Sequence, residues 1–171
     1  RTVVLISNSP IESIEKVYLD YQSRTLVVLA KVLSKNLWNI NPDWTPFAQE
    51  HSIKDIDPYD GLVIIGDKVF EHESQFKFKY DLAEEWIRLT GLPFVFAAWA
   101  ANKKMDDTFV DTFNKALRKG VENIKESIDF YPPVSLSKIE AEKYLRNNIS
   151  FEFTKEKREG LKLFWSLASM V

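Results

Sequence analysis

The residues best suited to chemistry lie in short polar stretches that follow apolar runs. Ser23 and Thr25 belong to the segment DYQSRT, between a predicted strand and a predicted helix. Free N–H groups at a helix start, two hydroxyls and the positive end of the helix dipole together favour a bound anion. An ordinary capping role for Ser23 is an equally good interpretation, and the two roles are compatible.

A second polar stretch, Gly66-Asp67-Lys68, follows the buried run GLVIIG. Ligands of open α/β sheets gather at the carboxyl ends of strands, where Gly66 would permit close approach and Asp67 could accept a proton. Spacing alone favours an ordinary strand-ending turn. Ser7 and Asn8 end the first strand in the same way, and a turn is the default interpretation there too.

Composition excludes several classes of function. The 171 residues include no cysteine, and His51 and His72 are the only histidines, so thiolate catalysis, disulfides and His-based triads or metal sites are disfavoured. A net charge of −2 argues against a nucleic-acid partner. No apolar run approaches the eighteen or so residues of a membrane helix. We expect His72, within Glu-His-Glu, to be a solvated loop residue.

Strands and helices alternate in the first half of the chain, which predicts an α/β fold with a mostly parallel sheet. The predicted strands are 2–7, 16–19, 44–47, 61–66 and 94–101. The predicted helices are a short one after Pro10, then 23–37 and 81–90. Trp99 lies inside an apolar strand in this scheme, so we expect it in the core.

The second half is helical. Apolar residues recur at helical period over 106–128, Ser137 and Glu140 have capping-box spacing, and Thr154 can cap a last helix. Gly120 and Gly160 within helices predict close helix packing. Such helices cannot bury their apolar stripes alone, so we expect an exposed apolar face or another chain covering it.

Several stretches resemble the chorismate dehydratase family of the futalosine route to menaquinone, which has the type II periplasmic-binding-protein fold. The most specific is YDLAEEWIRLTGLPFVFAAW at 80–99. The others are LDYQSRT, GLVIIGDK and NISFEFTKEKREGLKLFW. The similarity runs in order through essentially all of the chain.

The resemblance implies two lobes with mostly parallel sheets. Residues 1–99 would form lobe two with both crossing strands, 2–7 outgoing and 94–101 returning. Residues 100–171 would be the C-terminal helices of lobe one. The sheet of lobe one would be built by an N-terminal third that this chain lacks, and this fragment alone is expected to be inactive.

The resemblance also implies a cytoplasmic lyase that converts chorismate, a small dianion, to 3-[(1-carboxyvinyl)oxy]benzoate and water. No cofactor, metal, nucleic acid or membrane is expected, and a homodimer stays open. The expected catalytic residue is Asp67, and the expected substrate-binding residues are Ser23, Thr25, Gly66, Ser7 and Asn8.

Two other functions stay open. The sister enzyme, 1,4-dihydroxy-6-naphthoate synthase, shares the fold, but we would expect a His-containing motif where this chain has Gly66-Asp67-Lys68. The other is a non-catalytic receptor for small anions, which a leader sequence in the complete gene would favour.

Overall fold

The computed structural model describes residues 3–20, 23–47, 53, 56–134 and 136–171. These residues form two compact units. The sheet unit consists of Arg1–Phe96 and Thr154–Val171, and the helical unit consists of Ala97–Phe153. None of the described helices is long and apolar enough to cross a membrane.

A five-stranded sheet lies at the centre of the sheet unit, with strand order β3-β2-β4-β1-β5. The strands are β1 (Val3–Ser7), β2 (Lys16–Leu19), β3 (Asp43–Pro46), β4 (Asp60–Ile65) and β5 (Phe78–Asp81). β3, β2 and β4 pair in parallel, while β1 is antiparallel to both β4 and β5. Four strands therefore share one direction and β1 runs against them, which confirms the predicted α/β class and its mostly parallel sheet.

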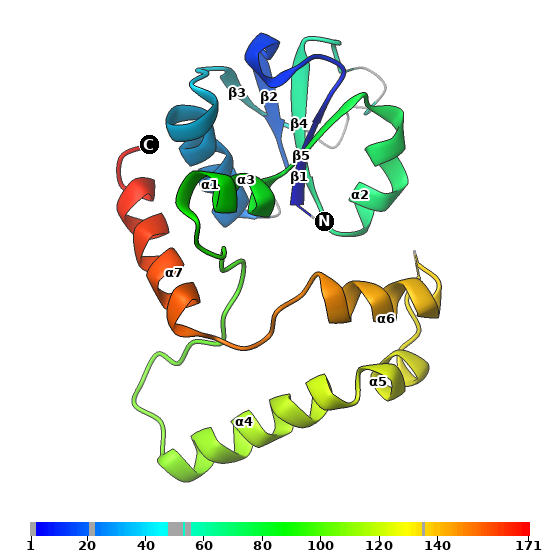
Figure 1. The fold of residues 1–171 in the computed structure, drawn as a ribbon, viewed down its shortest axis with the longest axis vertical. Coiled ribbons are helices and arrows are strands. Elements are labelled where there is room, and N and C mark those ends of the chain that lie inside the picture. The colour runs from blue at the N-terminus through cyan, green and yellow to red at the C-terminus, as the bar shows by residue number, and fades with distance from the viewer. Residues whose placement is uncertain (1–2, 21–22, 48–52, 54–55, 135) are drawn as a thin grey trace. The chain divides into compact units, whose positions relative to one another are not determined.

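Helices cover both faces of this sheet (Figure 1). α1 (Arg24–Leu33), α3 (Leu82–Thr90) and α7 (Lys155–Ala168) share a core with Leu5 and Val63. α2 (Asp67–His72) supplies Val69 to the opposite core, which contains Val4 and Ile6. Successive β1 side chains thus enter opposite cores, as the continuous apolar run predicted.

Several predicted elements are present close to their expected bounds. A 3₁₀ turn (Ile11–Ser13) follows Pro10, and a π-helical turn (Ser34–Trp38) extends α1 to the predicted length. Another 3₁₀ turn (Glu73–Gln75) follows α2. α3 begins after the capping residue Asp81 and ends at Gly91, whose φ of 70° suits glycine.

The helical unit contains α4 (Asp107–Glu122), α5 (Ile124–Phe130) and α6 (Lys138–Asn147). Its small core joins Ile124, Ile128 and Ala141. The predicted capping box of Ser137 and Glu140 is confirmed at the start of α6. α4 has no buried residue, and Phe109 on its apolar stripe is 52% exposed.

The predicted strand 94–101 is wrong: these described residues form neither helix nor strand. Phe94 packs into the sheet unit, with its ring 5.4 Å from Trp86 and 4.9 Å from Phe164. An apolar segment becomes a strand only where a neighbouring strand supplies backbone partners, and no described strand pairs with this one. The core position expected for Trp99 is likewise wrong, since it is 78% exposed and touches Phe113 edge to face.

α7 packs in the sheet unit, whereas we expected all residues after 100 to belong together. The ring of Phe164 lies 5.9 Å from that of Trp86, and both side chains are buried. The assignment of 1–99 and 100–171 to two lobes remains a prediction.

Candidate functional site

Four of the six predicted site residues lie at one edge of the sheet. β2 and β4 are parallel neighbours, with Leu19 opposite Val63, so both strands end at the same edge. The chain leaving β2 leads to Ser23 and Thr25 at the start of α1. The chain leaving β4 leads to Gly66 and Asp67 at the start of α2. The pairing of two strands therefore brings together residues that are some forty positions apart.

The positive end of α1 receives no compensation from Ser23 or from its own first turn. Ser23 occupies the N-cap position, but its side chain makes no capping hydrogen bond to α1. The first turn contains no acidic residue, and Arg24 within it is exposed. A cation is unfavourable at this end of a helix dipole and an anion is favourable. Among the described residues of this helix start, neither the Ser23 side chain nor an acid of the first turn offsets the dipole, which favours an anionic ligand.

Four other helix starts have a side-chain cap, whereas α2 and α5, like α1, have none. Side chains cap α3, α4, α6 and α7, supplied by Asp81, Asp106, Ser137 and Thr154. The sequence left two interpretations of Ser23 open. One was ordinary side-chain capping, and the structure does not contain the hydrogen bond that this interpretation requires. Both Ser23 and Thr25 are partly exposed, so a ligand can reach their hydroxyls.

The turn after β4 requires glycine. Gly66 has φ 66° and ψ −144°, a conformation that other residues rarely adopt. A Cβ built on Gly66 would have no other atom within 4 Å, so the space above this backbone is open. Asp67 follows as the first residue of α2 and is exposed. Its carboxylate is therefore accessible beside a backbone that a ligand can approach closely.

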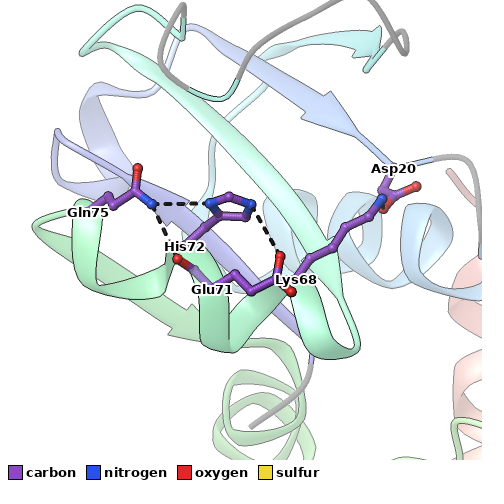
Figure 2. A network of polar contacts seen from close by, with 5 residues as sticks. All are labelled: Asp20, Lys68, Glu71, His72 and Gln75. Carbon is purple, nitrogen blue, oxygen red and sulfur yellow. Dashed lines mark hydrogen bonds and ion pairs between the residues drawn. The ribbon is translucent and has the colours of Figure 1, made fainter. Parts of the chain in front are cut away.

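An ion pair between Asp20 and Lys68 spans the same edge. Lys68 Nζ donates to Asp20 Oδ2 at 2.9 Å, and Figure 2 shows the lysine side chain extended toward that carboxylate. Both residues belong to the polar stretches singled out in the sequence, but no role was assigned to either. The sequence contained a signal for this ion pair. Asp20 directly follows β2 and Lys68 closely follows β4, and these two strands are parallel neighbours in the sheet.

Ser7 and Asn8 lie at the opposite edge, because Ser7 pairs with Gly61 at the start of β4. At about 3.3 Å per residue, the length of β4 separates them from Gly66 by over 13 Å. The buried Ser7 hydroxyl donates to the carbonyl of Asp60 at 3.0 Å and accepts from the N–H of Ser9 at 3.1 Å. These bonds stabilise a turn, which was the default interpretation. The structure does not bring Ser7 or Asn8 together with Ser23.

Among the described residues of the sheet unit, Glu156 at the start of α7 has a lowered pKa, and the other shifted pKa values belong to that opposite edge. Burial raises the pKa of Asp60 above its ordinary value, although Lys16, 3.6 Å away, acts to lower it. The Asp60 carboxylate in turn raises the pKa of Lys16. Burial also raises the pKa of Tyr80, whose hydroxyl accepts a hydrogen bond from the N–H of Ile11. The ion pair of Lys16 and Asp60 connects two strands, and the hydrogen bond of Tyr80 connects a strand to a turn.

His72 ends α2 rather than lying in a loop, which corrects the prediction. Gln75 Nε2 lies 3.1 Å from His72 Nδ1, and Glu71 Oε2 lies 3.8 Å from its Nε2 (Figure 2). His51, Tyr21 and Gln22 fall outside the described residues.

The helical unit has a shallow groove of about 350 Å³. It contains none of the predicted site residues. Its lining comes from the end of α4, the start of α5, the end of α6 and the segment after it: Val121, Ile124, Leu145, Arg146, Ile149, Ser150, Phe151 and Glu152.

A comparison with protein families identifies the chain. The model of one family, described as menaquinone biosynthesis, matches residues 1–170. The match takes in both units and every residue of the sheet edge described above. The chain is therefore a member of a menaquinone biosynthesis family.

Proposed function

We propose that this chain is the greater part of a cytoplasmic chorismate dehydratase, a lyase of the futalosine route to menaquinone. The observation that carries the proposal is the common sheet edge of Ser23, Thr25, Gly66 and Asp67 in a member of a menaquinone biosynthesis family. A helix start that Ser23 does not cap, two hydroxyls, an open glycine backbone and a carboxylate form a set that suits a small acidic substrate.

Substrate binding would depend on neutral donors. Chorismate is a dianion, and the hydroxyls of Ser23 and Thr25 with the N–H groups of α1 can hold one carboxylate. Gly66 would allow the ring to lie against the backbone, because there is open space where a Cβ would project. Orientation and shielding from water are the main demands, since aromatisation itself supplies a large driving force.

The chemical step removes a proton from C3 of chorismate and hydroxide from C4, which leave together as one water. The ring becomes aromatic, and no other reactant is needed. Asp67 would accept the proton or orient the departing hydroxyl, and its exposure beside the open Gly66 backbone supports this role. A carboxylate of the substrate is the alternative proton acceptor.

The two-lobed, type II periplasmic-binding-protein arrangement is part of the proposal. β1 lies between β4 and β5 and runs against both of them, which suits a strand entering from another lobe. α4 carries an apolar stripe with no buried residue, which suits a helix that lies on a further sheet. An N-terminal segment of the complete protein would build that sheet, and the 171 residues alone would be inactive.

The test is chorismate turnover by the complete gene product. Chorismate is incubated with the protein in the presence of a chelator and followed by ultraviolet spectroscopy and mass analysis. We expect 3-[(1-carboxyvinyl)oxy]benzoate and water. Intact chorismate with consumption of a futalosine derivative would instead support the sister 1,4-dihydroxy-6-naphthoate synthase. Tight binding without consumption of either would support a small-anion receptor.

A further inference from the structure

The direction of the Asp67 carboxylate depends on how α2 is oriented. Of the six residues of α2, all of which the structure describes, Val69 alone is buried. The turn before the helix is made by Gly66 at φ 66°, and glycine permits many other conformations there. One buried anchor and a glycine turn fix the depth of α2 in the core better than the rotation of α2 about its own axis.

The Lys68 side chain supplies a second anchor. Its Nζ donates to Asp20 Oδ2 at 2.9 Å, across a separation of 48 positions in the sequence. The N–H of Asp20 donates to the carbonyl of Val63 at 3.3 Å, so the backbone that carries this carboxylate is attached to β4. The Asp20 side chain is only 9% exposed, whereas that of Lys68 is 46% exposed. The lysine therefore contacts a largely buried carboxylate at the edge of the sheet.

Anchors on two neighbouring residues fix the rotation of a helix. Successive residues of an α-helix point about 100° apart, so Val69 in the core and Lys68 on Asp20 together determine where Asp67 points. We infer that Lys68 is a positioning residue, which orients the Asp67 carboxylate toward the substrate by holding α2 to Asp20. This inference rests on the proposed function, because it takes Asp67 as the group that accepts the proton or orients the departing hydroxyl.

The inference predicts a loss in kcat rather than in affinity. Lys68→Met keeps an apolar stem and removes the ammonium, so kcat for chorismate falls by on the order of tenfold, because a misplaced catalytic group reacts more slowly. KM stays within about twofold, because Ser23 and Thr25 belong to the start of α1. Lys68→Arg retains a cation that can reach Asp20 and regains most of kcat.

A substitution of the partner tests whether Lys68 acts through Asp20. Asp20→Asn removes the charge that Lys68 contacts, so kcat falls in this variant as well. Adding Lys68→Met to Asp20→Asn then changes kcat by less than about twofold, because the lysine has already lost its anchor. Additive losses would mean that Lys68 acts on another group.

A second ion pair in the same unit provides the matched control. Lys16 Nζ lies 3.6 Å from Asp60 Oδ2 and connects the same two strands, β2 and β4, at the opposite edge of the sheet. The exposed fractions of these two side chains are 40% and 8%, close to those of Lys68 and Asp20. Lys16→Met should shift the midpoint of thermal unfolding about as much as Lys68→Met but leave kcat within about twofold.

Hydrogen exchange of the complete gene product measures the anchoring of α2 without any substrate. The N–H of Val69 donates to the carbonyl of Gly66 at 3.1 Å, at the first turn of α2. We expect the amides of α2 to exchange on the order of threefold faster in Lys68→Met, which is the size of effect that one partly exposed ion pair supplies. In Lys16→Met their exchange should be unchanged.

Three results would overturn the inference: an unchanged kcat in Lys68→Met, a raised KM with kcat unchanged, or exchange of the α2 amides as slow as in the unchanged protein. The second of these would make Lys68 a ligand of the substrate. Failure of the proposed function is distinguishable, because chorismate would then remain intact in the unchanged protein while hydrogen exchange still decides whether Lys68 holds α2.

Discussion

Gly160 in α7 lies directly against the carbonyl oxygen of Pro93, so closely that a Cβ at residue 160 would overlap that oxygen. The glycine thus allows α7 to approach the segment that follows α3. This contact confirms the close packing predicted for Gly160. The same prediction is wrong for Gly120, where a Cβ would have no neighbour within 4 Å.

These two glycines make a matched pair for mutation. Gly160→Ala should lower the free energy of unfolding by about 1–3 kcal/mol, because α7 must shift away from Pro93. Gly120→Ala should raise it by up to about 1 kcal/mol through helix propensity. Urea titrations followed by circular dichroism of the 171-residue chain measure both. Equal effects of the two substitutions would contradict the packing argument.

Ser23→Ala should affect ligand binding more than folding. Ser23 makes no capping hydrogen bond with its side chain, so its loss should cost less than about 0.5 kcal/mol of stability, below the usual cost of a lost cap. The affinity of the complete protein for chorismate should fall by roughly tenfold, the worth of about one hydrogen bond to a charged group. Calorimetric titration and thermal unfolding measure the two effects.

Thr154→Ala is the control for this substitution. The Thr154 hydroxyl accepts from the N–H of Lys157 at 3.4 Å and caps α7. Its removal should cost about 1 kcal/mol of stability and leave chorismate affinity unchanged. If Ser23→Ala destabilised the fold as much as Thr154→Ala while binding stayed the same, Ser23 would be a structural residue.

Acid should weaken the start of α6. Glu140 accepts hydrogen bonds from the hydroxyl and the N–H of Ser137, at 2.6 and 2.9 Å, and these bonds lower the pKa of Glu140 from its ordinary 4.5. Because the folded-state pKa is the lower one, the stabilisation is present above about pH 4.5 and is lost as the pH falls through the folded-state value. The native chain should therefore lose more helicity than Glu140→Gln between about pH 6 and pH 3. Superimposable circular dichroism titrations would contradict this.

The apolar stripe of α4 should bind a hydrophobic dye in the 171-residue chain. Phe109 and Leu117 on this stripe are 52% and 38% exposed. We expect strong ANS fluorescence or self-association, and a clear decrease in both when Phe109 and Leu117 are replaced by Glu. Asn114→Glu, away from the stripe, is the control. A monodisperse chain with no dye binding would rule out an exposed stripe.

The sequence predicted those elements whose signal is local. The 2–7 run and the Ser137–Glu140 capping box required only burial periodicity and side-chain chemistry, and both are present. The run 94–101 has the same composition as a buried strand, yet strand formation depends on a partner that no local signal reveals. For the same reason, local patterns could not predict which strands pair. The pairing of β2 with β4 brings Ser23 and Gly66 to one edge of the sheet, and the pairing of β1 with β4 leaves Ser7 at the opposite edge.

The position of β1 between β4 and β5 has a consequence for synthesis on the ribosome. β1 appears at the start of this chain, but its partners are Gly61–Ile65 of β4 and Phe78–Asp81 of β5. At about 5–20 residues per second, β1 waits several seconds before both neighbours exist. During that interval an apolar strand has two unpaired edges, which is a recognised aggregation hazard. Slower translation of the segment between β1 and β5 should therefore reduce the soluble yield, because it lengthens the time for which β1 needs protection by a chaperone.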